Sequence, residues 1–167
     1  MKCRTKIWKA AIFLCLVSVG GIVNAQSAGT HVDVGPGHAG AGASASGAWQ
    51  HTDTESRVGA TNMGRALAIG AGPNGLSLSH SIGVNAGGRG VGHNFNLSIG
   101  PGGSHVSHGG VVTERGNSRV IAGGNTQGGY FPNGGSTVTG FGRRTHAYTE
   151  SRTMPTPPMF PFARRGR

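Results

Sequence analysis

Histidine is the residue type with the widest chemical scope in this 167-residue chain, which contains eight of them. A metal site needs side chains that converge on one coordination sphere. In the strand register derived below, His80 and His93 are diagonal neighbours on adjacent strands, and they are the candidate ligands. The same register places His108 opposite Leu97, about 13 Å along the strand from His93, which is too far for a three-histidine site. The favoured interpretation is therefore structural or exposed histidines, with no metal and no cofactor.

Acid–base and nucleophilic catalysis have little support in the sequence. Asp53 and Glu55 would share one face of a strand, but no cleft that would perturb paired carboxylates is evident, so a solvated edge is the favoured interpretation. The chain lacks a G-x-S-x-G nucleophile motif. The glycine-rich run at 87–90 lacks the G-K-[ST] ending of a phosphate loop, and a hairpin explains it better. We predict that the protein is not an enzyme.

Two kinds of modification signal are present. Asn96-Leu97-Ser98 is an N-glycosylation sequon, usable in a eukaryote, and the register places Asn96 on a polar face where a glycan could stand. Gly142-Arg143-Arg144 resembles the glycine-plus-dibasic processing signal of secreted precursors. The favoured interpretation is a basic tail that could attract anionic polymer, mineral or lipid surfaces, with no specific nucleic-acid site, through Arg143, Arg144, Arg164, Arg165 and Arg167.

The elements that would position these residues are short strands between residues 67 and 121. Apolar and small polar residues alternate there between glycine turns, which is typical of half-buried strands in a β-meander. A type I′ turn at Asn74-Gly75 would pair Ile69 with His80, and a similar turn at 102–103 would pair Leu97 with His108. Between them, a loop at 85–90 sets Leu78 against Leu97. The register cannot be extended past Thr113.

This register separates the meander into two faces. One face is apolar, so we expect it to be covered and Leu97 to be buried. The other face suits water, sugar or a second sheet, and we expect Asn96 to be exposed on it with the other short polar residues, Ser77, Ser79, Ser81, Asn94, Ser98 and Ser107.

The amino terminus predicts secretion. A basic start, an apolar run at 10–23 and small residues at Val23 and Ala25 are typical of a signal peptide cleaved after Ala25. The run is shorter than the roughly 20 residues that a transmembrane helix needs. Both cysteines, Cys3 and Cys15, lie in this leader, so the mature chain would have no disulfide.

Composition divides the rest of the chain. The predicted segments after the signal peptide (1–25) are a Gly/Ala/Ser-rich arm with a possible edge strand (26–65), the meander (66–142) and a basic, proline-rich, disordered tail (143–167). The formal net charge of +10 includes four basic residues of the leader, which leaves +6 for the mature chain. The predicted fold class is all-β, an antiparallel meander between a flexible arm and a flexible tail.

The stretch AGAGASASGA at 39–48 resembles the Gly-Ala-Ser repeats of silk-like proteins, although a flexible linker explains it better. In composition the chain is similar to silk-like, cuticle and shell-matrix proteins. That similarity implies a secreted structural protein of a matrix or coat. A second copy would cover the apolar face through Leu78, Leu97, Ile99 and Val106. The alternative is a cationic defence protein that resembles attacins in composition and acts on bacterial envelopes.

The leader makes a direct prediction: the secreted protein begins at Gln26. Amino-terminal peptide mapping of the secreted product measures this. A secreted product that retains Cys15 would refute the cleavage site.

Overall fold

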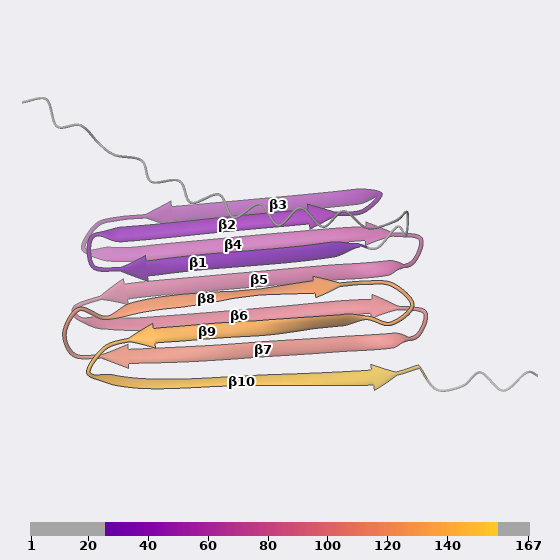
Figure 1. Cartoon of the computed structure of the whole chain (residues 1–167). Helices are drawn as coiled ribbons and strands as arrows, with labels where there is room; N and C mark the ends of the chain where they lie inside the picture. The colour runs from indigo at the N-terminus through magenta and orange to yellow at the C-terminus, as the bar shows by residue number, and fades with distance from the viewer. Residues whose placement is uncertain (1–25, 157–167) are drawn as a thin grey trace, which may run out of the picture.

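The computed structural model describes residues 26–156 as ten antiparallel strands in two stacked sheets (Figure 1). The part of the chain that it describes contains no helix. The strands are β1 (Ser27–Gly35), β2 (His38–Ser46), β3 (Trp49–Arg57), β4 (Thr61–Gly72), β5 (Gly75–Ala86), β6 (Arg89–Gly100), β7 (Gly103–Glu114), β8 (Arg119–Gln127), β9 (Asn133–Phe141) and β10 (Arg144–Pro155).

The first part of the predicted meander (66–142) is confirmed at the centre of the larger sheet, as β4 to β7, whereas its last part forms β8 and β9 of the smaller sheet. The larger sheet has six strands in the order β10-β7-β6-β5-β4-β3, so β3 to β7 follow one another as in the chain. The smaller sheet has the order β2-β1-β8-β9, two hairpins joined side by side. Figure 1 shows the strands of both sheets aligned along nearly one axis, with arrows that point in both directions, and the smaller sheet stacked on the larger one.

The segments flanking the meander are strands. Residues 27–57, expected from their composition to be mostly a flexible arm, form β1, β2 and β3, and β3 is the edge strand that the sequence suggested. The first part of the predicted tail forms β10, which pairs with β7; residues 157–167 lie outside the described part of the chain. The prediction of a flexible arm was wrong because Gly, Ala and Ser are weak strand formers alone, yet here they line the contact between two sheets.

The predicted register is right in one hairpin and wrong in two. Leu78 lies opposite Leu97, as expected from the turn between β5 and β6. The other two turns begin at proline, at Pro73 and Pro101, so each pairing is shifted by two residues. Proline fixes φ near the value that the first central position of a common turn requires. A two-residue shift leaves every side chain on its predicted face.

The face that the sequence assigned to solvent is the buried one. The smaller sheet covers the Ser/Asn face of the larger sheet, so Asn96 is fully buried and Leu97 on the opposite face is only partly buried. Of the three alternatives for the polar face, a second sheet is correct. It is supplied by β1, β2, β8 and β9, segments that the sequence analysis did not expect to form a matching sheet.

Small residues are needed in this interface because the two backbones come very close. A Cβ added to Gly70 would lie 2.2 Å from the backbone oxygen of Ser46, and one added to Gly64 would lie 2.8 Å from that of Gly40. Real Cβ atoms do not approach backbone oxygen so closely. The apolar core of the described residues is correspondingly small. It contains the clusters Val32, Ala66 and Ala122, and Val34, Val111 and Val120, together with the buried Ala28 and Ala68.

Hydrogen bonds fill the rest of the interface. Thr30 of β1 bonds both Ser79 and Ser81 of β5 at 2.7 Å. The Asn96 amide nitrogen donates to the Asn94 side-chain oxygen at 2.6 Å and, across the interface, to the backbone oxygen of Gly135 at 3.0 Å. Each buried polar side chain in this group therefore has a partner, as a buried amide requires.

The sequence register implies that a substitution at Leu97 destabilises the fold more than one at Asn96. The buried hydrogen-bond network reverses this expectation. Asn96→Asp would place a carboxylate against the Asn94 and Gly135 oxygens, whereas Leu97→Asp would place one on a partly exposed face. We expect Asn96→Asp to lower the free energy of unfolding by about 3 kcal/mol or more, and Leu97→Asp by clearly less. Urea denaturation followed by circular dichroism measures both. A larger loss for Leu97→Asp would contradict the buried position of the polar face.

Candidate functional site

The side of the six-stranded sheet that faces away from the smaller sheet is not covered by any described strand. We call it the outer face. Apolar residues dominate its middle strands, and several remain well exposed, with Val91 at 51 %, Ile99 at 43 % and Val112 at 41 %. Strand alternation produces this face, because every second residue of β5, β6 and β7 points away from the sheet interface.

Three histidines lie in the middle of the outer face. His80 and His108 flank Phe95 on neighbouring strands, and His93 lies two residues along from Phe95. The predicted diagonal relation of His80 and His93 is confirmed. His108, in contrast, pairs with Phe95 and not with Leu97, and its ring stacks 6.4 Å from that of His93. The distance argument that separated His108 from His93 was wrong, because it depended on the shifted turn.

Charge and burial both act on these rings. Partial burial lowers the pKa of His80, and the neighbouring His93 and Arg65 lower that pKa further. The His108 ring lies 3.4 Å from the Glu150 carboxylate of β10 and meets the Tyr148 ring edge-on. Within residues 26–156, no group of three or more His, Cys, Asp or Glu side chains is arranged to hold a metal ion.

His105 shows what an inward histidine does in this fold. It lies on the opposite face of β7 from His108, as strand alternation requires of residues three apart, and it is buried. Its two ring nitrogens lie 2.8 Å from the Thr153 hydroxyl and 3.2 Å from the Ser151 hydroxyl, both on β10. This histidine therefore fastens the edge strand to the sheet.

The remaining predicted residues occupy edges and interior. Asn96 is enclosed between the sheets, so its predicted exposure as a glycan acceptor is wrong. Asp53 and Glu55 lie on the edge strand β3, where Arg65 contacts both carboxylates. Arg143 and Arg144 lie at the exposed start of β10. The predicted cleavage after Ala25, and the residues Arg164, Arg165 and Arg167, lie outside the described residues.

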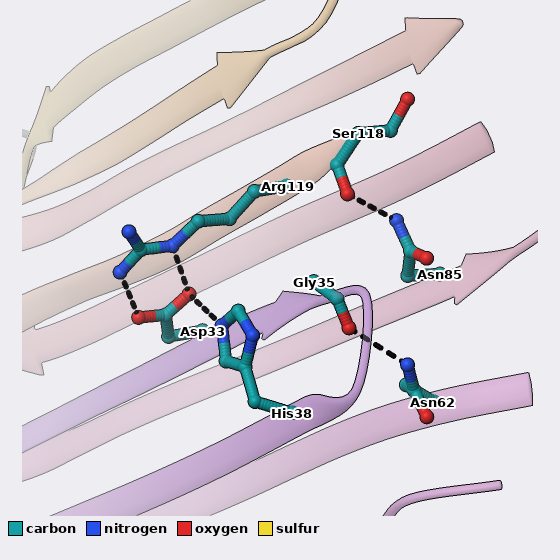
Figure 2. Close-up of polar contacts among 7 residues, drawn as sticks. All are labelled: Asp33, Gly35, His38, Asn62, Asn85, Ser118 and Arg119. Atoms are coloured by element: carbon teal, nitrogen blue, oxygen red, sulfur yellow. Dashed lines mark hydrogen bonds and ion pairs between the residues drawn. The ribbon is translucent and has the colours of Figure 1, made fainter. Parts of the chain in front are cut away.

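A second polar cluster, which the sequence analysis missed, lies on the exposed side of the smaller sheet. Figure 2 shows the Arg119 guanidinium and the His38 ring both directed at the Asp33 carboxylate. Arg119 approaches both carboxylate oxygens, with a distance of 2.8 Å from Nε to Oδ1, and His38 Nε2 lies 3.1 Å from Oδ1. The signal available in the sequence was the Gly35-Pro36-Gly37 turn, which brings His38 back beside β1.

The larger sheet holds this cluster from beneath. Asn62 of β4 donates to the backbone oxygen of Gly35 at 2.7 Å, and Asn85 of β5 donates to that of Ser118 at 2.5 Å (Figure 2). Gly35 itself leaves room for the cluster, because a Cβ there would lie 2.4 Å from the His38 ring. These contacts fix the ends of β1 and β8 on the six-stranded sheet.

The chemistry of the cluster is that of a structural ion pair. The Arg119 hydrogen bonds hold the pKa of Asp33 below its usual value against the opposing effect of burial, and His38 adds to the lowering. Asp33 in turn raises the pKa of Arg119. Among the described residues no hydroxyl or thiol bonds the second nitrogen of the His38 ring, as a catalytic triad would require.

Comparison of the chain with protein-family models, curated proteins and solved structures gave no match. Within residues 26–156, no helix is long and apolar enough to cross a membrane.

The ion pair predicts a specific loss of stability in acid. Because the pKa of Asp33 is lowered in the folded chain, its contribution is fully present above the ordinary value of 3.8 and is lost as the pH falls through the lowered value. We expect Asp33→Asn to remove this part of the decline in thermal midpoint below about pH 4. Asp53→Asn, which breaks an exposed pair with Arg65, is the matched control. An equal effect of both substitutions would contradict the assignment.

Proposed function

We propose that this chain is a secreted structural protein of an extracellular matrix or coat, and that it self-associates through the outer face. The observation that carries the proposal is the set of large apolar side chains that residues 26–156 leave uncovered: Val91, Ile99 and Val112 are all exposed, on one side of one sheet. Exposed apolar side chains that gather on one face are typical of interaction sites.

The distribution of charge supports association of this face with another protein surface. β5 carries no charged residue, while β6 and β7 carry only Arg89 and Glu114, which lie opposite each other in the strand register at one end of the sheet. Formal charges gather on the two edge strands of this sheet, at Asp53 and Glu55 of β3 and at the acidic and basic residues of β10. An apolar centre with a polar rim is the usual anatomy of a protein–protein interface.

A second copy of the chain is the partner that needs no further assumption. The outer face is self-complementary in character, since apolar residues and histidines fill its centre and both signs of charge border it. The smaller sheet adds a route for growth, because its edge strand β2 presents uncharged side chains from Ala39 to Ala45. Edges without charge or proline are prone to pair with other strands.

Sedimentation velocity of the secreted protein over a wide concentration range tests this proposal. We expect dimers or larger assemblies, and Ile99→Asp, at a position already 43 % exposed, should shift association to at least about tenfold higher concentration, a change of about 1.4 kcal/mol. Thr139→Asp, on the exposed side of the smaller sheet, is the matched control and should change nothing. A compact monomer at every concentration would overturn the proposal.

A cationic defence protein that acts on bacterial envelopes is the second candidate. The observation that favours it is the edge strand β10, where Arg144 and Arg152 lie beside the exposed Tyr148 and Met154, next to the apolar outer face. Such an edge suits an anionic lipid surface. A monomer that binds anionic vesicles and not zwitterionic ones would favour this candidate over the structural protein.

A further inference from the structure

Gln26 is the residue whose chemistry fits its surroundings least. It is the first described residue and is only 1 % exposed, at the point where the chain enters β1. Among residues 26–156, neither polar atom of its side chain, Nε2 or Oε1, has a hydrogen-bond partner. A carboxamide offers two donors and an acceptor. A buried amide without partners is rare because each unpaired group loses its hydrogen bonds to water and gains none in the protein.

The surroundings of Gln26 explain why it is buried. Its side chain lies against the bare backbones of Gly72 and Gly128: a Cβ added to Gly72 would come within 2.5 Å of Nε2, and one added to Gly128 within 3.2 Å of Oε1. Its main chain is held firmly. The Gln26 carbonyl accepts a hydrogen bond from the Gly128 amide at 2.7 Å and another from the Ser77 hydroxyl at 3.0 Å.

We propose that Gln26 is a modification site, and that it becomes an amino-terminal pyroglutamate. The proposal rests on signal-peptide cleavage after Ala25 and not on self-association. Once cleavage frees the α-amine of Gln26, its nitrogen attacks the side-chain carbonyl carbon Cδ. A bond forms between that nitrogen and Cδ, the Cδ–Nε2 bond breaks, and Nε2 leaves with the displaced proton as ammonia. The five-membered lactam forms with no oxidant, reductant or other co-reactant.

The lactam suits this buried position better than uncyclised Gln26 does. Uncyclised Gln26 would bring a charged ammonium and an unpaired carboxamide to a buried site, and both carry a desolvation penalty. The lactam has no charge and retains one N–H and one ring carbonyl. It also keeps the main-chain carbonyl to which Gly128 and Ser77 donate.

Mass spectrometry of the product secreted from the full precursor tests the proposal. The amino-terminal peptide should begin at residue 26 and be lighter than the unmodified peptide by one ammonia. Edman degradation should be blocked, and pyroglutamyl aminopeptidase should unblock the unfolded chain at least about tenfold faster than the folded one, since the residue is enclosed. The matched variant Gln26→Ala cannot cyclise and should give an open amino terminus that reads Ala.

Each other outcome overturns the proposal. An unmodified Gln26 at the amino terminus would show that the site does not drive cyclisation, and a product that begins elsewhere would show that the site is never created. Equal unblocking of folded and unfolded chains would show that the ring is not enclosed between Gly72 and Gly128. None of these results bears on self-association, which sedimentation measures separately.

Discussion

The close approach of the two sheets is the constraint on which the rest of this structure depends. Backbones that meet as Gly64 and Gly40 do leave no room for a large side chain. Glycine, alanine, serine and asparagine therefore line most of the interface, where valine is the largest apolar residue, and the leucine, isoleucine and phenylalanine side chains of β5 and β6 point to the other side. The apolar outer face is thus a direct consequence of the thin interior, since strand side chains alternate between two faces.

Hydrogen bonding replaces much of the stabilisation that a large apolar core would supply. Ser79, Asn94 and Asn96 bond one another and the facing sheet, and a satisfied buried network specifies one alignment of the two layers. Small side chains also lose little conformational entropy when they are buried. At the end of the interface, the side chains of Asn62 and Asn85 donate hydrogen bonds to backbone oxygens at the end of β1 and just before β8.

The sequence predicted the strands of the meander and the separation of its faces, because period-two alternation survives a two-residue error in register. It could not tell which face is buried. Hydrophobicity favoured Leu97, whereas the glycines and alanines of β1 and β2 supply a partner that fits only the Asn96 side. The Asp33 cluster joins residues from β1, β2 and β8, so its assembly depends on a pairing of distant strands that local patterns do not encode.

The central claim is that the polar face is the interior, and exchange of side-chain amide protons tests it most directly. In heavy water, followed by NMR, the Nδ2 protons of Asn94 and Asn96 should be protected to about the same extent as the backbone amides of β6. The exposed side chains of Asn125 and Asn133 provide the unprotected reference. Exchange of Asn94 and Asn96 as fast as these two would contradict the account, because it would place the polar face in contact with water.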